Sequence, residues 1–563
     1  MAELTRSYVH GAGTEPLLGE TIGTYLERVG ASRPEGLALV DRGQGARLTW
    51  RQLDDRVDEI AAALLGLGLA PGERVAIWAQ NRVEWVLTQF ATARAGLVLV
   101  NINPAARGGE VKDFLHQVEA RALVVQDAFK TSDYIGMVND MLPELAGSEP
   151  GGLRAAALPE LRWIIRLGES ASPGMLRFEE LAGRADEPAR ARLRQLAGQV
   201  QFDDPVNIQF SNATGGKPAG ATLTHHNILN NGFVVGRTLR LGEADRVCLP
   251  VPLFHCFGMV MGNMACLAHG STMVYPGEAF DPLQTLEAVA AEACTAVYGV
   301  PAMFKAMLEH ERFAEFDLSS LRTGIMAGAP CPIETMRQVI SAMHMEQVVI
   351  GYGMTETSPV SFMSDVDDSV EHRVSTVGTI RPHTEAKVID SDGRVVPPGV
   401  TGELCTRGYN VMRGYWGNPA LTRQVIDAAG WMHTGDLAQI DGAGYCRIVG
   451  GIKDMIIRGG ENIYPAEVEE FLAGHPAIAE AVVVGVPDER MGEELCACLR
   501  LEPGATLDAD GVRDYCRENI AHYKVPRHVR LYRDFPGSTG RALKFMLREE
   551  SLRALGLEAA DPD

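Results

Sequence analysis

The chain has 563 residues, enough for two or more domains with ample apolar cores. Its 46% hydrophobic and 22% charged residues are ordinary for a globular protein, and its formal net charge of −21 argues against nucleic acids and anionic membranes as partners. A local site can oppose that overall field, so the charge does not exclude a nucleotide ligand.

Ten cysteines are scattered along the chain, and the closest pair, Cys496 and Cys498, lacks the C-x-x-C spacing of a zinc site. This usage is typical of reduced thiols, so we expect a cytoplasmic protein. The N-terminal residues contain no apolar signal segment. Apolar runs such as 61–70 fall short of the roughly 18 residues that a membrane-spanning helix needs. We therefore expect no membrane span, and homodimerisation stays open.

Strands and helices alternate along the first 350 residues. Apolar residues at helical spacing predict an amphipathic helix over 49–69, ended by Pro71-Gly72. A second helix is expected over 84–95. The predicted strands cover 74–78, 97–100, 122–125, 273–275, 296–298 and 347–350. Such alternation is typical of parallel sheets covered by helices.

The pattern changes beyond residue 360. Segments 386–389 and 402–406 alternate polar and apolar residues between Gly and Pro turns, which predicts a small β-rich subdomain over about 360–450. We expect this subdomain to close a large N-terminal domain of residues 1–450, whose remainder is built of α/β subdomains with parallel sheets.

A new pattern starts at residue 451. Helices are expected over 465–473 and 511–521, and strands over 479–486 and 495–501. These elements predict a small, mobile α+β C-terminal domain of residues 451–563, whose last residues, 552–563, we expect to be frayed.

A small, hydroxylated and Gly-rich segment covers residues 209–221. It cannot pack a core, but it can expose backbone N–H groups to an anion such as a phosphate. It is not a P-loop, because the spacing G-x-x-x-x-G-K-[ST] is missing. Three further motifs follow downstream, at 351–357, 431–437 and 453–465.

These four motifs, in this order and at these separations, resemble the adenylate-forming superfamily of acyl-CoA synthetases, luciferases and peptide-synthetase adenylation domains. The resemblance runs from residue 7 to about 549 and is closest to bacterial medium-chain acyl-CoA synthetases. It implies an ATP-dependent ligase that joins a small-molecule acid to the α-phosphate of ATP and expels pyrophosphate. The activated group then passes to an acceptor, of which CoA is the first candidate. ATP and Mg²⁺ are the implied cofactors.

The resemblance implies a nucleotide site made from several segments. It places the loop residues Thr214, Gly215, Gly216 and Lys217 at the phosphates of ATP. It places Tyr352 against adenine and Asp436 at both ribose hydroxyls. The adenine pocket would be completed by Gly328, Ala329, Pro330, Gly351, Gly353 and Met354.

The same resemblance implies the reacting groups. Thr355 would hold the α-phosphate, and Glu356 would bind Mg²⁺ as a hard oxygen ligand. His255 would gate the acid, although a lone histidine there could equally be a satisfied core residue. The acyl pocket would be lined by Tyr298, Gly299, Val300 and Gly328.

The resemblance of the C-terminal motifs implies the part of the site that would bind the acceptor. In the superfamily the small domain swings between adenylation and transfer, here about a hinge at Lys453, a further candidate nucleotide contact. Gly459 and Gly460 would admit the pantetheine arm of CoA, because only glycine leaves room for so close an approach. A further matching motif covers 523–526, and its Lys524 would belong to the same acceptor site.

Three departures from the superfamily pattern fall on cations. Ala219 stands where the loop has lysine, Gly451 where the hinge motif has arginine, and Arg541 where the C-terminal motif has its catalytic lysine. Lys544 is the nearest rival to Arg541 for that role. Arginine keeps the charge but is a rigid planar fork, so the exchange is not conservative. Since the nucleotide residues are retained, we expect ATP binding with an unusual acid or acceptor.

Three hypotheses remain. The first is a carboxylate–CoA ligase with tolerated drift. The second is a repurposed adenylating enzyme that activates nitrite for transfer to an aromatic amine, a diazotase, because a guanidinium can bind a small planar oxyanion through two hydrogen bonds. The third is a nucleotide-binding protein that keeps the fold without catalysis.

Overall fold

A nine-stranded sheet forms the centre of the computed structural model, which describes residues 4–211, 218–328, 331–390, 392–451, 455–463, 465–535 and 540–557. Its strand order is β19-β18-β17-β16-β15-β13-β14-β2-β3. The strands from β2 to β17 in this order run parallel, with antiparallel strands at both edges. Their bounds are β2 Leu37–Asp41, β3 Ala46–Thr49, β13 Arg246–Cys248, β14 Thr272–Tyr275, β15 Ala296–Gly299, β16 Thr323–Ala327, β17 Gln347–Gly353, β18 Val360–Met363 and β19 Thr379–Ile380.

An eight-stranded sheet, of order β10-β9-β6-β4-β5-β11-β12-β22, lies beside it. The strands from β10 to β11 are parallel, and β12 and β22 close the edge as antiparallel strands. Their bounds are β4 Arg74–Trp78, β5 Val98–Asn101, β6 Ala122–Val125, β9 Trp163–Arg166, β10 Leu176–Arg177, β11 Pro205–Ser211, β12 Ala219–Thr224 and β22 Gly414–Tyr415. The two-residue strands β7 Ala128–Phe129 and β8 Ser132–Asp133 form a separate hairpin.

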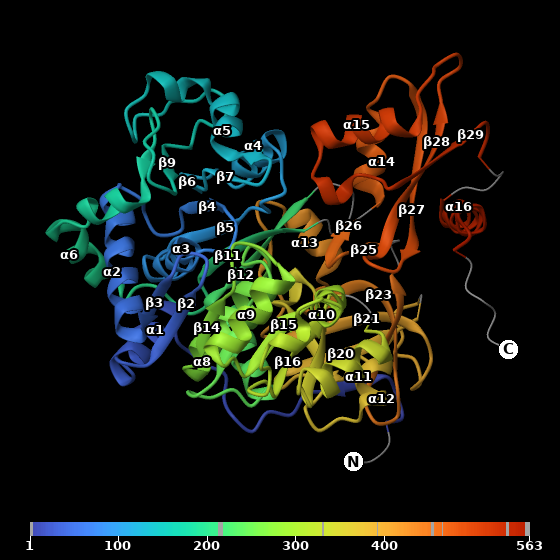
Figure 1. Cartoon of the computed structure of the whole chain (residues 1–563), viewed down its shortest axis with the longest axis horizontal. Coiled ribbons are helices and arrows are strands. Elements are labelled where there is room, and N and C mark those ends of the chain that lie inside the picture. Colours follow the sequence, from blue (N-terminus) through green and yellow to red (C-terminus); the bar gives the residue numbers. More distant parts are fainter. Residues whose placement is uncertain are drawn as a thin grey trace.

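Helices cover these two sheets, as the alternating pattern predicts (Figure 1). Most begin at a side-chain cap; Thr49 and Gln52, for example, form a capping box before α2. The α-helices are α1 Ile22–Ser32, α2 Trp50–Gly66, α3 Val83–Arg94, α4 Gly108–Gln117, α5 Tyr134–Met141, α6 Glu187–Leu196, α7 His225–Thr238, α8 Ala265–His269, α9 Pro282–Glu292, α10 Pro301–Leu308, α11 Ile333–Ala342, α12 Val370–Ser375 and α13 Pro419–Val425. The other helical segments of this domain are the π-helix η3 Phe257–Met264 and the 3₁₀ helices η1 Pro143–Gly147, η2 Phe178–Arg184, η4 Phe313–Glu315 and η5 Thr355–Thr357.

The predicted β-rich subdomain is an antiparallel sheet of order β1-β20-β21-β23-β24. Four of its strands are β20 Thr384–Ile389, β21 Gly402–Gly408, β23 Met432–Ile440 and β24 Cys446–Gly451. The fifth, β1 Tyr8–His10, comes from the N-terminus and pairs with β20. The subdomain therefore includes a strand that the sequence analysis did not assign to it.

The small C-terminal domain has a sheet of order β26-β25-β28-β27, with β29 paired to β28. Its elements are β25 Ile456–Arg458, β26 Glu461–Ile463, α14 Pro465–Ala473, β27 Ile478–Asp488, β28 Gly492–Leu501, α15 Ala509–Asn519, η6 His522–Lys524, β29 His528–Tyr532 and α16 Gly540–Leu555. Alternate residues of β27 and β28 face opposite sides, so Val483 packs with the core under α14 and α15, whereas Val482 and Val484 pack with Leu547 of α16. Helix α16 thus lies on the sheet face opposite α14 (Figure 1).

These observations confirm the predicted fold: a large α/β N-terminal domain with parallel sheets, and a small C-terminal domain of helices and strands. One prediction was wrong. Residues 552–557 are not frayed, because α16 extends to Leu555 and Leu552, Leu555 and Leu557 pack against the apolar cluster on β27 and β28. Residues 558–563 lie outside the described part. In the described part, no helix is both long and apolar enough to cross a membrane.

Candidate active site

A cavity of about 120 Å³ lies where the two large sheets meet the C-terminal domain. Ser211 from the end of β11, His255 from the loop before η3, and Thr355 and Glu356 of η5 line one side. Glu461, Tyr523 and Lys524 of the C-terminal domain line the other. Residues predicted for catalysis and for the acceptor therefore converge on one space.

The Glu356 carboxylate is held inside this cavity and is only 5% exposed. The hydroxyls of Ser211 and Tyr415 both donate to its Oε1, the bond from Tyr415 measuring 2.9 Å. Glu356 follows the central sheet, whereas both donors belong to the eight-stranded sheet. The carboxylate is thus fixed from outside its own segment, as a preorganised metal ligand needs to be.

The turn before Glu356 is specified by Gly353. A Cβ at this position would lie 1.7 Å from the carbonyl oxygen of Pro359, so only glycine fits. The Met354 N–H donates to that same oxygen at 3.1 Å, which fixes the start of η5. Met354, Thr355 and Glu356 consequently follow one another along the cavity wall.

The predicted adenine and ribose residues are in contact. The Tyr352 hydroxyl at the end of β17 donates to Oδ2 of Asp436 on β23 at 2.6 Å. Burial raises the pKa of Asp436, and this hydrogen bond lowers it part of the way back. Gly351 precedes Tyr352 on β17. Gly451 stands at the position of the missing hinge arginine; it lies on β24, where its backbone pairs with that of Asp436 on β23.

The His255 ring is neutral at physiological pH. Burial lowers the pKa of His255 to about 4. Its Nδ1 accepts a 3.1 Å hydrogen bond from the Phe257 N–H, which assigns the ring proton to Nε2. The ring lines the cavity together with Thr355, so it can donate a hydrogen bond there but brings no charge.

The residues predicted for the acyl pocket pack together as an apolar group, here called the acyl wall, and none of them lines the cavity described above. Tyr298 is fully buried, with its ring stacked 6.0 Å from that of Phe257. A Cβ added at Gly299 would meet the Phe304 ring at 3.2 Å. Gly328 has φ +84°, and a Cβ there would lie 3.3 Å from Cγ1 of Val300. These contacts bring Val300 and Gly328 together.

The predicted acceptor turn reaches this wall. Gly459 and Gly460 have φ values of +58° and +89° and close the two-residue hairpin between β25 and β26. A Cβ at Gly460 would lie 2.8 Å from Cγ1 of Val300. The turn that the resemblance assigns to the acceptor therefore touches a residue that it assigns to the acid.

Several predicted residues cannot be located in this way. Thr214, Gly215, Gly216 and Lys217 of the phosphate loop, Ala329 and Pro330 of the adenine pocket, and Lys453 of the hinge lie outside the described residues. Arg541 lies in the first turn of α16. Lys544, one turn further, forms a 2.9 Å ion pair with Glu469 of α14.

Ala219, the position of the superfamily's loop lysine, begins β12 and is buried in the main apolar cluster. A lysine at this position would have to leave an apolar cluster, in which a charged group is unfavourable.

The sequence analysis missed Ser211 and Tyr415 as partners of Glu356, and it missed Glu461 as a residue that lines the cavity. Hydrogen bonds between remote segments leave no spacing pattern from which to infer them.

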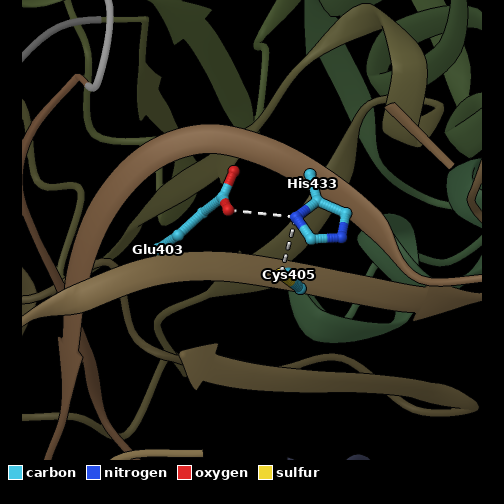
Figure 2. Close-up of side chains that lie close together, drawn as sticks. All are labelled: Glu403, Cys405 and His433. Carbon is cyan, nitrogen blue, oxygen red and sulfur yellow. Dashed lines mark hydrogen bonds and ion pairs between the residues drawn. The ribbon is translucent and has the colours of Figure 1, made fainter. Parts of the chain in front are cut away.

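The side chains of Glu403, Cys405 and His433 form a cluster on β21 and β23 (Figure 2). Asp436 also lies on β23. Cys405 of β21 pairs with His433 of β23, and Nδ1 of His433 lies 3.0 Å from Oε2 of Glu403 and 3.6 Å from Sγ of Cys405. Burial raises the pKa of the Cys405 thiol to about 12, so the thiol is uncharged. We interpret the cluster as an anchor that fixes the strand on which Asp436 lies.

Two family models and many known proteins match this chain. The protein-family model described as "AMP-binding enzyme" matches residues 26–416, and the family model described as "AMP-binding enzyme C-terminal domain" matches residues 467–539. The chain is 45% identical to the medium-chain acyl-CoA ligase ACSF2, mitochondrial, of Danio rerio over 560 residues, covering 98% of this chain and 92% of the relative. It is 42% identical to the putative acyl-CoA synthetase YngI of Bacillus subtilis (strain 168), covering 97% and 99%.

Solved structures of related enzymes have the same fold as this chain. The amide bond synthetase McbA from Marinactinospora thermotolerans superposes with a TM-score of 0.78 at 26% identity, covering 95% of this chain and 99% of that one. A fatty acyl CoA synthetase of Mycobacterium tuberculosis gives a TM-score of 0.65 at 27% identity, with the same coverage. The chain therefore belongs to the AMP-binding enzymes of the adenylate-forming superfamily and is an AMP-forming acid ligase.

Proposed function

We propose that this ligase converts a medium-chain carboxylic acid, ATP and CoA into the acyl-CoA thioester, AMP and pyrophosphate. The observation that carries the proposal is the contact between Gly460 and Val300, which brings the acceptor turn to the acyl wall beside the Glu356 cavity. The medium-chain acyl-CoA ligases of similar sequence support the choice of acid and acceptor.

In the first step, the protein's role is to hold the acid against the α-phosphate. Glu356 would bind Mg²⁺, which supplies charge neutralisation at the phosphates. Thr355 would hydrogen-bond the α-phosphate, while Tyr352 and Asp436 would fix the nucleoside. Neutral His255, which carries its proton on Nε2, would donate a hydrogen bond to the acid without neutralising its carboxylate.

The acyl wall favours an apolar acid. Tyr298, Phe257 and Val300 are buried and belong to the main apolar cluster. Burying alkyl groups against such side chains yields roughly 0.8 kcal/mol per CH₂, so each additional methylene should improve binding until the space is full.

We further propose two rigid domains that meet at about residues 450 and 451, with a hinge at Lys453. In the present arrangement the Gly459–Gly460 turn faces Val300, and α16 lies on the sheet face opposite α14. This arrangement suits transfer to the acceptor. Adenylation, in which Arg541 is proposed to act, would require the C-terminal domain to turn its α16 side towards the cavity.

The cation at the reacting oxygen is proposed to be Arg541. An Arg541→Ala variant should slow adenylation by about 10²–10³-fold, the usual effect of removing one oxyanion-stabilising group. Lys544→Ala is the matched control, because Lys544 already pairs with Glu469 and should matter little. A larger loss in the Lys544 variant than in the Arg541 variant would show that the motif is misaligned.

The experiment that tests the proposal is acid-dependent ATP–pyrophosphate exchange with fatty acids of increasing length, aryl acids and nitrite. Medium-chain acids should give the highest kcat/KM. Exchange with nitrite alone would favour the diazotase hypothesis, and no exchange with any acid would favour a binding protein. Neither alternative gains support from the relatives described above.

A further inference from the structure

Lys524 joins the two domains through a buried ion pair. Its Nζ lies 3.0 Å from Oε1 of Glu110 on α4 and also pairs with Glu467 on α14. Glu467 belongs to the same domain as Lys524, whereas Glu110 belongs to the N-terminal domain. Lys524 is only 5% exposed, so the pair is shielded from solvent and little screened by salt.

The protonation state of Lys524 suits this role. Burial alone would lower the pKa of Lys524, but Tyr523, Glu467 and Glu110 together raise it above the usual value. The ammonium is therefore charged at working pH. Domain opening would separate the ammonium from Glu110 and leave Glu467 as its carboxylate partner.

The segment with Lys524 is tied rigidly to the acceptor turn. Arg458, the last residue of β25, donates from Nη1 to the carbonyl oxygen of Tyr523 at 2.7 Å. Its Nε lies 2.7 Å from the buried Glu494 carboxylate. The next two residues are Gly459 and Gly460. The segment that carries Lys524 is thus hydrogen-bonded to the residue that precedes the turn contacting Val300.

We propose that the Lys524–Glu110 ion pair is a positioning element that holds the C-terminal domain in the arrangement for acyl transfer. The inference rests on the proposed function, since it assigns this arrangement to the second step. Lys524 and Glu110 are positioning residues, because they set the place of the Gly459–Gly460 turn through Arg458. The pair breaks when the domain turns for adenylation, and so it selects between the two steps.

Glu110 offers a clean test. Its Oε2 accepts a 2.9 Å hydrogen bond from the Arg107 N–H and caps α4. Glutamine serves equally in such a capping box, so Glu110→Gln removes the charge and keeps the helix start. Asp113→Asn, on the exposed face of the same helix, is the matched control for loss of one negative charge.

The kinetic experiment measures the two half-reactions separately. Glu110→Gln should lower kcat/KM for CoA by about 10–100-fold, while its acid-dependent pyrophosphate exchange changes less than threefold. Lys524→Met should lower kcat/KM for CoA to the same extent. The kcat/KM for CoA of the double variant should be no lower than that of either single variant, because the two substitutions remove the same ion pair. Asp113→Asn should behave as wild type. Equal loss of both half-reactions, or additive losses in the double variant, would overturn the proposal.

A distance measurement tests the same pair without turnover. Nitroxide labels on Gln117→Cys of α4 and Glu518→Cys of α15, both exposed, would report the domain arrangement by pulsed electron resonance. Cys331→Ser removes the one cysteine of the described residues that is not buried. Wild type should give a narrow distance distribution that Glu110→Gln broadens and Asp113→Asn does not. An unchanged distribution in Glu110→Gln would overturn the proposal even if CoA proved not to be the acceptor.

Discussion

The Tyr352 hydroxyl donates a 2.6 Å hydrogen bond to the Asp436 carboxylate, which connects the central sheet to the β-rich subdomain. The two residues come from motifs far apart in the sequence, and the resemblance assigned them to adenine and ribose. If these roles hold, the contact would place the adenine and ribose groups of one nucleoside side by side. It also orients the carboxylate before any ligand arrives.

Tyr352→Phe should therefore weaken ATP binding without abolishing catalysis. The phenyl ring can still stack on adenine, but Asp436 loses a charge-assisted hydrogen bond of about 1.5–3 kcal/mol. We expect KM for ATP to rise about tenfold and kcat to change little, as measured by initial rates over a range of ATP concentrations. An unchanged KM would show that Asp436 does not depend on Tyr352 for nucleotide binding.

Glu356→Gln should remove most activity and leave the fold intact. Glutamine can still accept hydrogen bonds from Ser211 and Tyr415, but it withdraws the charged oxygen proposed for Mg²⁺. We expect pyrophosphate exchange to fall by about 10²–10³-fold with a thermal unfolding midpoint close to wild type. Tyr415→Phe, which removes only one supporting donor, should cause a smaller loss. A Glu356→Gln variant as active as wild type would contradict the assignment.

Gly460→Ala should separate the two half-reactions. Its φ of +89° is unfavourable for alanine, and the new Cβ would meet Val300 at 2.8 Å. Transfer to CoA should be nearly lost while pyrophosphate exchange continues. The control is Gly504→Ala in the same domain, where φ is +82° but an added Cβ would meet no atom within 4 Å. If both variants lose transfer equally, backbone strain rather than contact with Val300 is responsible.

Glu461 should make stability depend on pH. Burial raises the pKa of Glu461 from 4.5 to about 7, and Lys524 opposes part of that rise. The folded state therefore holds a proton that the unfolded state releases, so stability from this group falls as pH rises from about 4.5 to about 7. The thermal midpoint of wild type should fall relative to that of Glu461→Gln over this range. Parallel midpoints across the range would show that the Glu461 pKa is unshifted.

The sequence predicted the elements well where their signals are local. Strands β4 and β6 and helix α14 begin and end where their apolar patterns indicated. Strand β1 was not assigned to the β-rich sheet, because its partner β20 lies far along the chain and no local pattern records such pairing. The end of α16 was missed because Leu552 and Leu555 become buried only against β27 and β28.

In the candidate site, too, the sequence indicated residues within local motifs but not contacts between remote segments. Motif resemblance proposed Thr355, Glu356, Tyr352 and Asp436 as site residues, because they lie within short recognisable segments. It could not identify Glu110 as the partner of Lys524, since the two are 414 residues apart and belong to different domains. The Cys405–His433 contact likewise arises only when β21 pairs with β23, so cysteine spacing alone gave no hint of it.

The most direct test of the account is product analysis after incubation with ATP, Mg²⁺, CoA and a medium-chain acid such as octanoate. Chromatography with mass detection should show AMP, pyrophosphate and acyl-CoA formed in equal amounts, with no ADP. Omitting CoA should leave acyl-AMP bound to the protein. Formation of ADP, or AMP formation that does not depend on the acid, would contradict the assignment as an AMP-forming acid–CoA ligase.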